Sequence, residues 1–196
     1  MIKFRALLAL PLLMLACAPQ GGVDSSGRGD PAPLVYAPPG TQFTLANSSN
    51  GKPSETRIAA GNPAGPRGAF VRPDGAVGTF YPGCWSCGGG FQIEEAKYAA
   101  LWPLETGKSV SFLRTAPDGN RARVTISVTG TETIEIPAGT FDTYVLSGRV
   151  EHLTGPSYSA NVRAFWAPRP GWVIRAEGSD SRGNQLTSTA TEIIER

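Results

Sequence analysis

Three Pro-X-Gly triplets occur along the chain, and they constrain its fold more than any other feature. They occupy residues 73–75, 117–119 and 137–139. In such a triplet the proline presets φ for the second position of a type I turn, and the glycine can adopt the left-handed conformation of the bulge that closes a three-residue hairpin. The triplets therefore predict three antiparallel hairpins.

The residues next to these turns alternate between apolar and polar side chains, as expected of strands. In RARVTISVT, residues 121–129, the even-numbered residues are apolar and the odd-numbered residues are Arg, Thr or Ser, which places the two kinds on opposite faces of a strand. Four later segments also fit strands, with residues 181–184 turning the last pair; they are residues 141–150, 158–166, 172–178 and 185–194.

A single helix is expected over residues 93–102. Pro103 ends it, because proline does not continue a helix. Its apolar stripe of Ile93, Ala96, Ala100 and Leu101 is predicted to pack on the sheet. The fold class that follows is all-β, or β-rich with one short helix, built as a curved antiparallel sheet of half-barrel or sandwich-like form.

The first residues of the sequence predict that the protein is exported from the cytoplasm. Lys3 and Arg5 precede an apolar run over residues 6–16, which is typical of a bacterial export signal. The run is too short for a permanent span, which needs about 20 apolar residues. We therefore predict a signal peptide over residues 1–16.

The stretch LLMLACAPQGG resembles the lipobox of bacterial lipoproteins, in which apolar and small residues lead into a lipid-modified cysteine, here Cys17. Met14 stands where that motif usually has Leu. The resemblance implies a lipid anchor in a membrane, and Ala18 differs from the Asp of an inner-membrane retention signal, so we expect the outer membrane, facing the periplasm. The alternative is ordinary cleavage after Ala18, because residues 16–18 also fit the A-x-A pattern, and it predicts a soluble periplasmic protein.

Composition divides the remaining chain into a tether and one domain. Residues 17–40 are rich in Gly, Pro, Ser and Ala, so we expect a lipidated N-terminus followed by a flexible tether. Residues 41–196 are expected to form a single β-rich domain. Without Lys3 and Arg5 the chain has 16 basic and 16 acidic side chains, and this balance predicts no nucleic-acid partner.

The pair Cys84 and Cys87 has four interpretations. A c-type haem anchor needs His after the second cysteine, and Gly88 is there. A zinc site needs four ligands, and besides this pair the mature chain offers His152 alone among Cys and His residues, so no metal is predicted. The glycines at 88–90 oppose the helix that would stabilise a catalytic thiolate. A disulfide that fixes a local turn is the prediction that remains, with a thiol-disulfide oxidoreductase as the alternative.

Such a turn would present Trp85 as a contact point for a partner or for the membrane interface. The alternative is that Trp85 caps the open end of the sheet. No catalytic residue and no cofactor are predicted, because the sequence contains no nucleophile elbow, zinc-protease motif or phosphate-binding loop. Glu94 and Glu95 are adjacent, so on a helix they point in different directions and cannot act as a paired acid and base.

Several late strands carry small residues that could share one face. They are Ala160, Ala164, Ala176, Gly178, Ser188 and Ala190. A face lined by small side chains leaves room above it. Either the helix or the N-terminal segments fill that room, or the room is an open cup for a lipid or a similar apolar ligand.

The segments VTISVTGTETIEIPAGTFDTYVL and FWAPRPGWVIR, together with LWPLETGKSVSF, resemble an uncharacterised group of bacterial periplasmic proteins and lipoproteins with a PAGTFDTY-like hairpin. The resemblance covers about the last hundred residues. It implies a curved sheet similar to the half-barrels of lipoprotein carriers, with Phe141 and Trp166 in the core, a bend at Pro168 and Gly171, and no catalytic residues.

These observations predict a non-enzymatic envelope lipoprotein that binds an apolar ligand in a curved-sheet cup. One alternative is a structural or assembly accessory lipoprotein whose partner is another envelope protein. The other alternative is a thiol-disulfide oxidoreductase that acts through Cys84 and Cys87.

Overall fold

The computed structural model describes residues 31–84 and 86–195. The predicted signal peptide, Cys17 and Trp85 lie outside this part of the chain. Within it, eleven strands form a single antiparallel sheet, and one short helix, α1 (Glu95–Ala99), packs beside it. The strands are β1 (Gln42–Ser49), β2 (Lys52–Ala60), β3 (Gly68–Val71), β4 (Val77–Phe80), β5 (Gln92–Ile93), β6 (Ser109–Thr115), β7 (Arg121–Ile136), β8 (Gly139–His152), β9 (Ser159–Ala167), β10 (Trp172–Asp180) and β11 (Gln185–Ile194).

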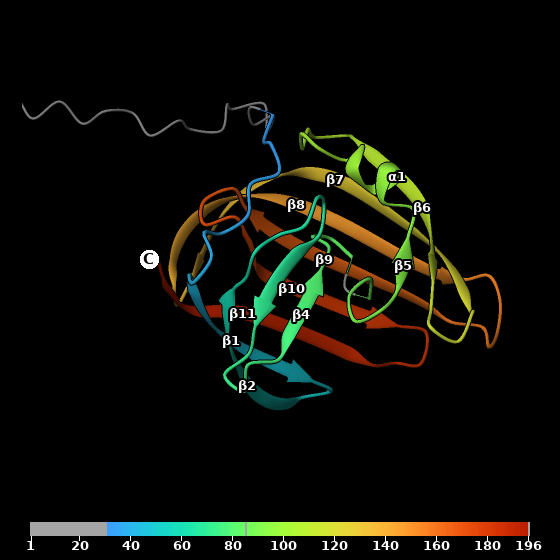
Figure 1. Cartoon of the computed structure of the whole chain (residues 1–196), viewed down its shortest axis with the longest axis horizontal. Helices are drawn as coiled ribbons and strands as arrows, with labels where there is room; N and C mark the ends of the chain where they lie inside the picture. Colours follow the sequence, from blue (N-terminus) through green and yellow to red (C-terminus); the bar gives the residue numbers. More distant parts are fainter. Residues whose placement is uncertain (1–30, 85, 196) are drawn as a thin grey trace, which may run out of the picture.

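The order of strands in the sheet follows the chain with one discontinuity. From edge to edge the order is β4-β3-β2-β1-β11-β10-β9-β8-β7-β6-β5. Strands that follow one another in sequence are therefore neighbours, except β4 and β5, which form the two edges. The strands form a deep arc (Figure 1), so the predicted curved antiparallel sheet is confirmed. In the connection between the two edges, residues 81–84 and 86–91 run along the concave face, and we call them the crossing segment.

Two of the three predicted turns have the expected geometry. Gly75 and Gly119 lie at φ 81° and 85°, and each N–H donates to the carbonyl three residues earlier, of Arg72 and Ala116, at 2.9 Å. The third hairpin differs, because its loop contains only two residues, 137–138, and Gly139 is already the first residue of β8, at φ 133°. The four strands expected near the C-terminus are confirmed as β8 to β11.

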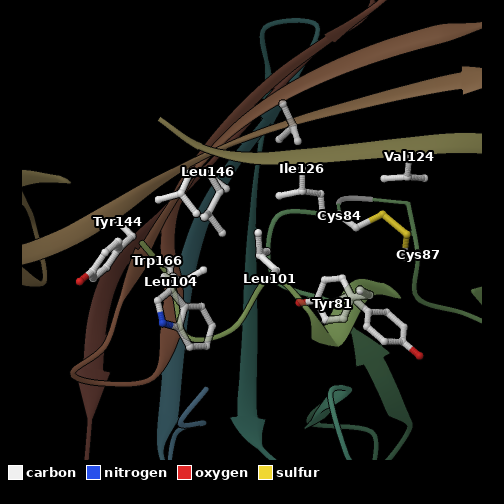
Figure 2. Packing of buried hydrophobic residues seen from close by; sticks show 14 of the residues in the cluster. Tyr81, Cys84, Cys87, Leu101, Leu104, Val124, Ile126, Tyr144, Leu146 and Trp166 are labelled. Carbon is white, nitrogen blue, oxygen red and sulfur yellow. A yellow bond between two sulfur atoms is a disulfide. The ribbon is translucent and has the colours of Figure 1, made fainter. Parts of the chain in front are cut away.

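The first hydrophobic cluster fills the concave face over β6 to β9. Side chains from the crossing segment and from the residues after it, including Tyr81 and Leu101, pack on Ile126, Leu146 and Trp166 of the sheet. Figure 2 shows these side chains facing one another. The space above this part of the sheet is therefore occupied by side chains. This agrees with one of the two alternatives given for the small residues, that other segments of the chain pack above them.

The helix is shorter than predicted, and only part of the expected apolar stripe is buried. It contains five residues, and Ala96 and Ala100 of the stripe are exposed. Leu101 of the stripe is buried and Ile93 packs against the first cluster, as predicted. Tyr98, which the stripe did not include, is also buried, and its hydroxyl donates to the carbonyl of Pro82 at 3.1 Å. The two alanines were predicted wrongly because the helix packs against the crossing segment as well as against the sheet.

A second cluster lies where the long β7–β8 hairpin curls towards β11. The hairpin bends at a bulge between Val128 and Gly130, and β7 contacts β11. The cluster contains Phe43, Phe165 and Trp172, and Phe141 is half-buried against it. The burial of Trp166 in the first cluster and of Phe141 here agrees with the core positions that the resemblance implied.

Residues 31–40 differ from the expected tether, because several of them pack against the domain. Ala32 forms an antiparallel bridge with Leu104, and the Ala37 N–H donates to the carbonyl of Gly171 at 3.1 Å. Ala32 and Ala37 are both buried. The folded unit therefore includes these residues, although their Pro- and Gly-rich composition favours a linker.

Candidate functional site

Three small side chains form a continuous row across the concave face. Ala176 of β10 pairs with Ala164 of β9 on one side and with Ser188 of β11 on the other. Ser188 in turn pairs with Asn47 of β1. Because directly paired residues share a face of the sheet, the predicted alignment of Ala164, Ala176 and Ser188 is confirmed.

A cavity of about 280 Å³, which we call the large hollow, lies above this row. Its wall opposite the sheet is the crossing segment and the strand before it, through Phe80, Tyr81, Gly83 and Cys84. The other lining residues are Leu45, Asn47, Thr56, Ile58, Phe70, Val162, Ala164, Trp172, Val173, Ala176 and Ser188. The first cluster thus packs on much of the concave face over β6 to β9, and the large hollow lies over β9, β10, β11, β1 and β2.

Aromatic rings form one end of the large hollow. The Phe80 and Trp172 rings lie 4.4 Å apart between centroids, and Phe43 stacks on Trp172 at 4.6 Å. Phe70 contacts Phe80 at 6.4 Å. Such contacts hold the rings in place and present apolar surface, so this end suits the apolar part of a ligand.

A smaller cavity of about 70 Å³, the small hollow, lies on the other side of Gly83 and Val162, which line both cavities. The close approach of Gly83 to the sheet separates them. A Cβ atom at Gly148 would overlap the Gly83 carbonyl oxygen and lie 2.7 Å from Cγ1 of Val162. Glycine at position 148 therefore lets the crossing segment lie directly on the sheet.

The disulfide between Cys84 and Cys87 is present, with 5.5 Å between the Cα atoms. Cys84 is 4% exposed and Cys87 is fully buried within the first cluster, beside Val124 and Ile126 (Figure 2). Rapid thiol exchange needs an accessible sulfur, often at the start of a helix, whereas this pair is enclosed and α1 begins only at Glu95. The geometry favours the structural disulfide over the oxidoreductase.

A polar cluster lies at the end of the concave face beyond the small hollow. Arg114 donates through Nη1 to the carbonyl of Ser86 at 2.9 Å, and its Nη2 lies 3.3 Å from Nε2 of His152. The guanidinium also lies 4.4 Å from the ring centroid of Phe91, and the His152 ring lies 4.8 Å from that of Tyr158. Burial lowers the pKa of Arg114 and raises the pKa of Tyr158. Arg114 was not among the residues predicted from the sequence.

Glu94 and Glu95 have separate partners, as their adjacency predicted. The Glu94 carboxylate accepts from Lys97 Nζ and from the Leu113 N–H, both at 2.8 Å, and the bond from Lys97 is the main cause of its lowered pKa. Glu95 accepts from the Tyr81 hydroxyl. Both acids thereby connect α1 to its surroundings.

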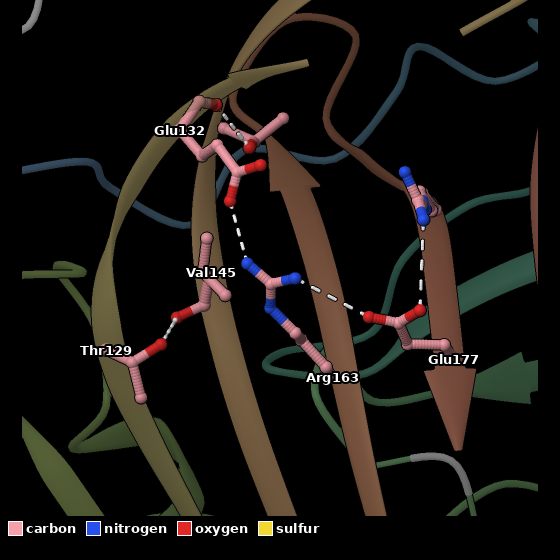
Figure 3. A network of polar contacts seen from close by, with 7 residues as sticks. Thr129, Glu132, Val145, Arg163 and Glu177 are labelled. Atoms are coloured by element: carbon pink, nitrogen blue, oxygen red, sulfur yellow. Dashed lines mark hydrogen bonds and ion pairs between the residues drawn. The ribbon is translucent and has the colours of Figure 1, made fainter. Parts of the chain in front are cut away.

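A charged network covers the opposite face of the sheet (Figure 3). Arg163 of β9 bonds to Glu132 at 2.7 Å and to Glu177 at 3.5 Å, and its guanidinium lies 4.6 Å from the ring centroid of Phe165. Arg175 pairs with Glu177 at 3.8 Å. The pairs are exposed, so each contributes little to stability, but together they link the curled hairpin to β9 and β10.

The described part of the chain offers neither a cluster of metal ligands nor a membrane-spanning helix. Residues 31–84 and 86–195 contain no group of three or more His, Cys, Asp or Glu side chains placed to hold a metal ion. Over the same residues, no helix combines the length and the apolar character needed to cross a bilayer.

No protein-family model and no curated protein sequence matches this chain. Among solved structures, it is similar to the hypothetical lipoprotein YmcC of Escherichia coli, with 13% identity, a TM-score of 0.48 and coverage of 81% of this chain and 89% of that one. A candidate lipoprotein of Parabacteroides distasonis has 14% identity, a TM-score of 0.49 and coverage of 84% and 99%. A candidate exported protein of Bacteroides fragilis with a YmcC-like fold has 14% identity, a TM-score of 0.47 and coverage of 84% and 100%. Similarity at this level assigns no function to the chain.

Proposed function

We propose that this protein is a non-enzymatic lipoprotein of the bacterial cell envelope and that the large hollow binds an apolar ligand. The large hollow itself carries the proposal, because a row of small side chains and a group of aromatic rings line an open hollow of about 280 Å³. Ligand sites are typically concave, mostly apolar and upwards of about 300 Å³. This volume lies near the lower end of that range, so the ligand that fits is a single acyl chain or a compact apolar molecule.

The polar groups of the large hollow suit binding better than catalysis. Asn47, Thr56 and Ser188 are neutral, and Cys84 is held in the disulfide. The remaining titratable group among the described lining residues is the Tyr81 phenol. Burial first, and then its hydrogen bond to Glu95, raise the pKa of Tyr81 to about 12, so the hydroxyl stays protonated at neutral pH and offers no base.

The anchor in this proposal is lipid on Cys17, as the lipobox resemblance implies, with the outer membrane as the site of attachment. Ala32 is docked on Leu104, so residues 17–31 connect the anchor to the domain. At about 3.3–3.6 Å per residue, fifteen residues reach at most roughly 50 Å. That length lets the domain and its hollow face the periplasm while the anchor stays in the membrane.

Filling the hollow tests the proposal. Ser188 lines the large hollow, whereas its neighbour Thr187 is exposed and, on a strand, projects from the opposite face. Ser188→Phe should occupy the hollow, and Thr187→Phe adds the same side chain to the same strand outside it. Native mass spectrometry of the full chain extracted from its host membrane measures which small molecules remain bound.

The expected result is an apolar species retained by the unsubstituted protein and by Thr187→Phe, and lost from Ser188→Phe. Equal retention by both variants, or no retained species in the unsubstituted protein, would overturn the ligand proposal. Protein partners that are recovered reproducibly without any small molecule would instead favour the assembly accessory.

A further inference from the structure

Arg114 is a cation in an unusual position. It lies on β6, its side chain is on the concave face in the row that continues through Ala122 and His152, and it is only 5% exposed. Arginine is almost never buried to this degree unless it is paired. The reason is that removing a charge from water costs several kcal/mol even after the protein relaxes.

The expected carboxylate partner is missing within the described part of the chain. The ion pairs of residues 31–84 and 86–195 all involve other basic residues. The contacts of Arg114 are a carbonyl, an imidazole nitrogen and an aromatic ring, none of which carries a full negative charge. Because guanidinium stays protonated in proteins, the cluster contains a positive charge that no carboxylate contacts directly; the nearest acid, Asp180, is bonded to Tyr158.

Three polar atoms of the same cluster are buried without a hydrogen-bond partner. They are Nε of Arg114, Nδ1 of His152 and Oγ of Ser86. Each residue contacts another member of the cluster, since Arg114 bonds to both Ser86 and His152. Buried polar groups are normally satisfied, so three unsatisfied atoms beside one unpaired cation indicate a missing acceptor.

The small hollow reaches this cluster. Ser86 and Tyr158 line it, whereas Arg114 and His152 lie behind these two residues, bonded to Ser86 and packed on Tyr158 respectively. Its other walls are largely apolar and include Val124, Val150 and Val162. Gly83 and Val162 also line the large hollow, so the two cavities adjoin.

The one acidic residue that lines the small hollow, Asp180, is not the missing acceptor for Arg114. The Asp180 carboxylate also lines the cavity, but it accepts the N–H groups of Arg182 and Asn184 and the side-chain amide of Asn184, at 2.8–2.9 Å. It is thereby held in the β10–β11 turn. An anion in the cavity is favoured at the Ser86 end, next to Arg114, and disfavoured at the Asp180 end.

We infer that Arg114, Ser86 and His152 form a subsite for an oxyanion, carried as the acidic head group of an amphiphilic ligand whose apolar part lies in the small hollow and continues past Val162, which lines both cavities, into the large hollow. The inference rests on the proposed function and narrows its ligand class to carboxylate- or phosphate-bearing amphiphiles. The guanidinium supplies the charge, and the Ser86 hydroxyl supplies a hydrogen-bond donor at the cavity wall.

The test compares an acid with the matching alcohol. Sodium decanoate and 1-decanol share an alkyl chain and differ in the head group. Calorimetric titration uses the full chain carrying Cys17→Ala, which removes the predicted lipid site and the need for detergent. Arg114→Gln removes the cation, and Arg123→Gln is the control, because Arg123 lies on the neighbouring strand β7 and is exposed.

We expect the parent protein to bind decanoate at least tenfold more tightly than decanol. Arg114→Gln should lower the affinity for decanoate to that for decanol and leave decanol unchanged, and Arg123→Gln should change neither. Equal affinities of the parent protein for acid and alcohol would overturn the oxyanion subsite and leave the apolar hollow standing. That comparison needs no variant, so it decides the question even where Arg114→Gln does not fold.

Inorganic phosphate separates the two sources of the oxyanion. Phosphate binding that depends on Arg114, without any binding of either amphiphile, would support a subsite for a free oxyanion and overturn the proposed function. Binding of none of the three probes would overturn both.

Discussion

Gly148→Ala should destabilise the protein, because the crossing segment lies directly on this glycine. An alanine Cβ would overlap the Gly83 carbonyl oxygen and approach Cγ1 of Val162 to 2.7 Å. The carbonyl belongs to the backbone, so it cannot rotate away as a side chain could. The segment between Tyr81 and Cys84, which is closed by a bridge between these two residues, has to move as a unit.

Two opposing effects set the size of the loss. Adding a methyl group to a packed interior costs about 1–3 kcal/mol. Replacing a strand glycine by alanine recovers about 0.5–1 kcal/mol, because glycine loses more conformational freedom on folding. The free energy of unfolding should therefore fall by about 1 kcal/mol, within a range of roughly 0–2.5 kcal/mol.

Gly130→Ala is the matched control and should have the opposite sign. Gly130 lies on the neighbouring strand β7, where a Cβ would meet no atom within 4 Å. The free energy of unfolding of this variant should rise by up to about 0.5–1 kcal/mol. Urea denaturation followed by tryptophan fluorescence, with the disulfide oxidised, measures the free energy of unfolding of both variants. If Gly148→Ala is as stable as Gly130→Ala, the crossing segment does not lie on β8, and the division into two hollows is wrong.

Three further predictions concern the anchor, the disulfide and the docked N-terminal segment. Cys17→Ala should move the protein from the membrane fraction to the soluble fraction or block its processing, and unchanged membrane recovery would contradict the lipid anchor. The double variant Cys84→Ala, Cys87→Ala should lose more free energy of unfolding than the roughly 2 kcal/mol expected from closure of so short a loop, because both residues are also buried. A smaller loss, measured by denaturation, would show that their packing contributes nothing. Gly171→Ala should lower the free energy of unfolding by about 1–3 kcal/mol more than Gly183→Ala does. Both glycines lie at positive φ, but only at Gly171 would a Cβ meet backbone atoms of residues 35–37, at 2.6 Å. Equal melting temperatures of the two variants would mean that this segment is not docked.

The local part of the fold could be predicted from the sequence because local chemistry determines it. The glycines of two Pro-X-Gly turns have the expected left-handed conformation, and hairpins joined by short loops fix which strands are neighbours. The registers are less local, because the pairing of β9 with β10 shifts at a bulge between Val173 and Arg175. The common face of Ala164, Ala176 and Ser188 was expected from their small side chains alone, and the pairing confirms it.

The first two strands were missed, although their turn has a recognisable signal. Asn50 and Gly51 lie at φ 52° and 77°, as expected of the Asn-Gly dipeptide in a two-residue hairpin. The flanking strands β1 and β2 are polar on both faces over much of their length, so apolar alternation is weak there. The turn was the stronger evidence and should have outweighed the missing pattern.

Arg114 was also missed, and its signal lies in the same alternation that identified the strands. In β6 the residues Val110, Phe112 and Arg114 occupy every second position, so a charged residue continues an inward-facing apolar series. A charge at an inward position of a strand needs a partner or a ligand. Which of these applies depends on the crossing segment, whose path no local pattern predicts.

The crossing segment connects the disulfide to both cavities. Gly83 separates the two hollows, Cys84 lines the large one, and Ser86 lines the small one while its carbonyl holds Arg114. Ser86 lies within the loop that the bond between Cys84 and Cys87 closes. A loop this short gains little global stability from its disulfide, but the bond limits the positions that Ser86 can adopt relative to Arg114. In the proposed function the cysteine pair therefore belongs to the binding site, because it fixes the segment that forms the polar end of the small hollow.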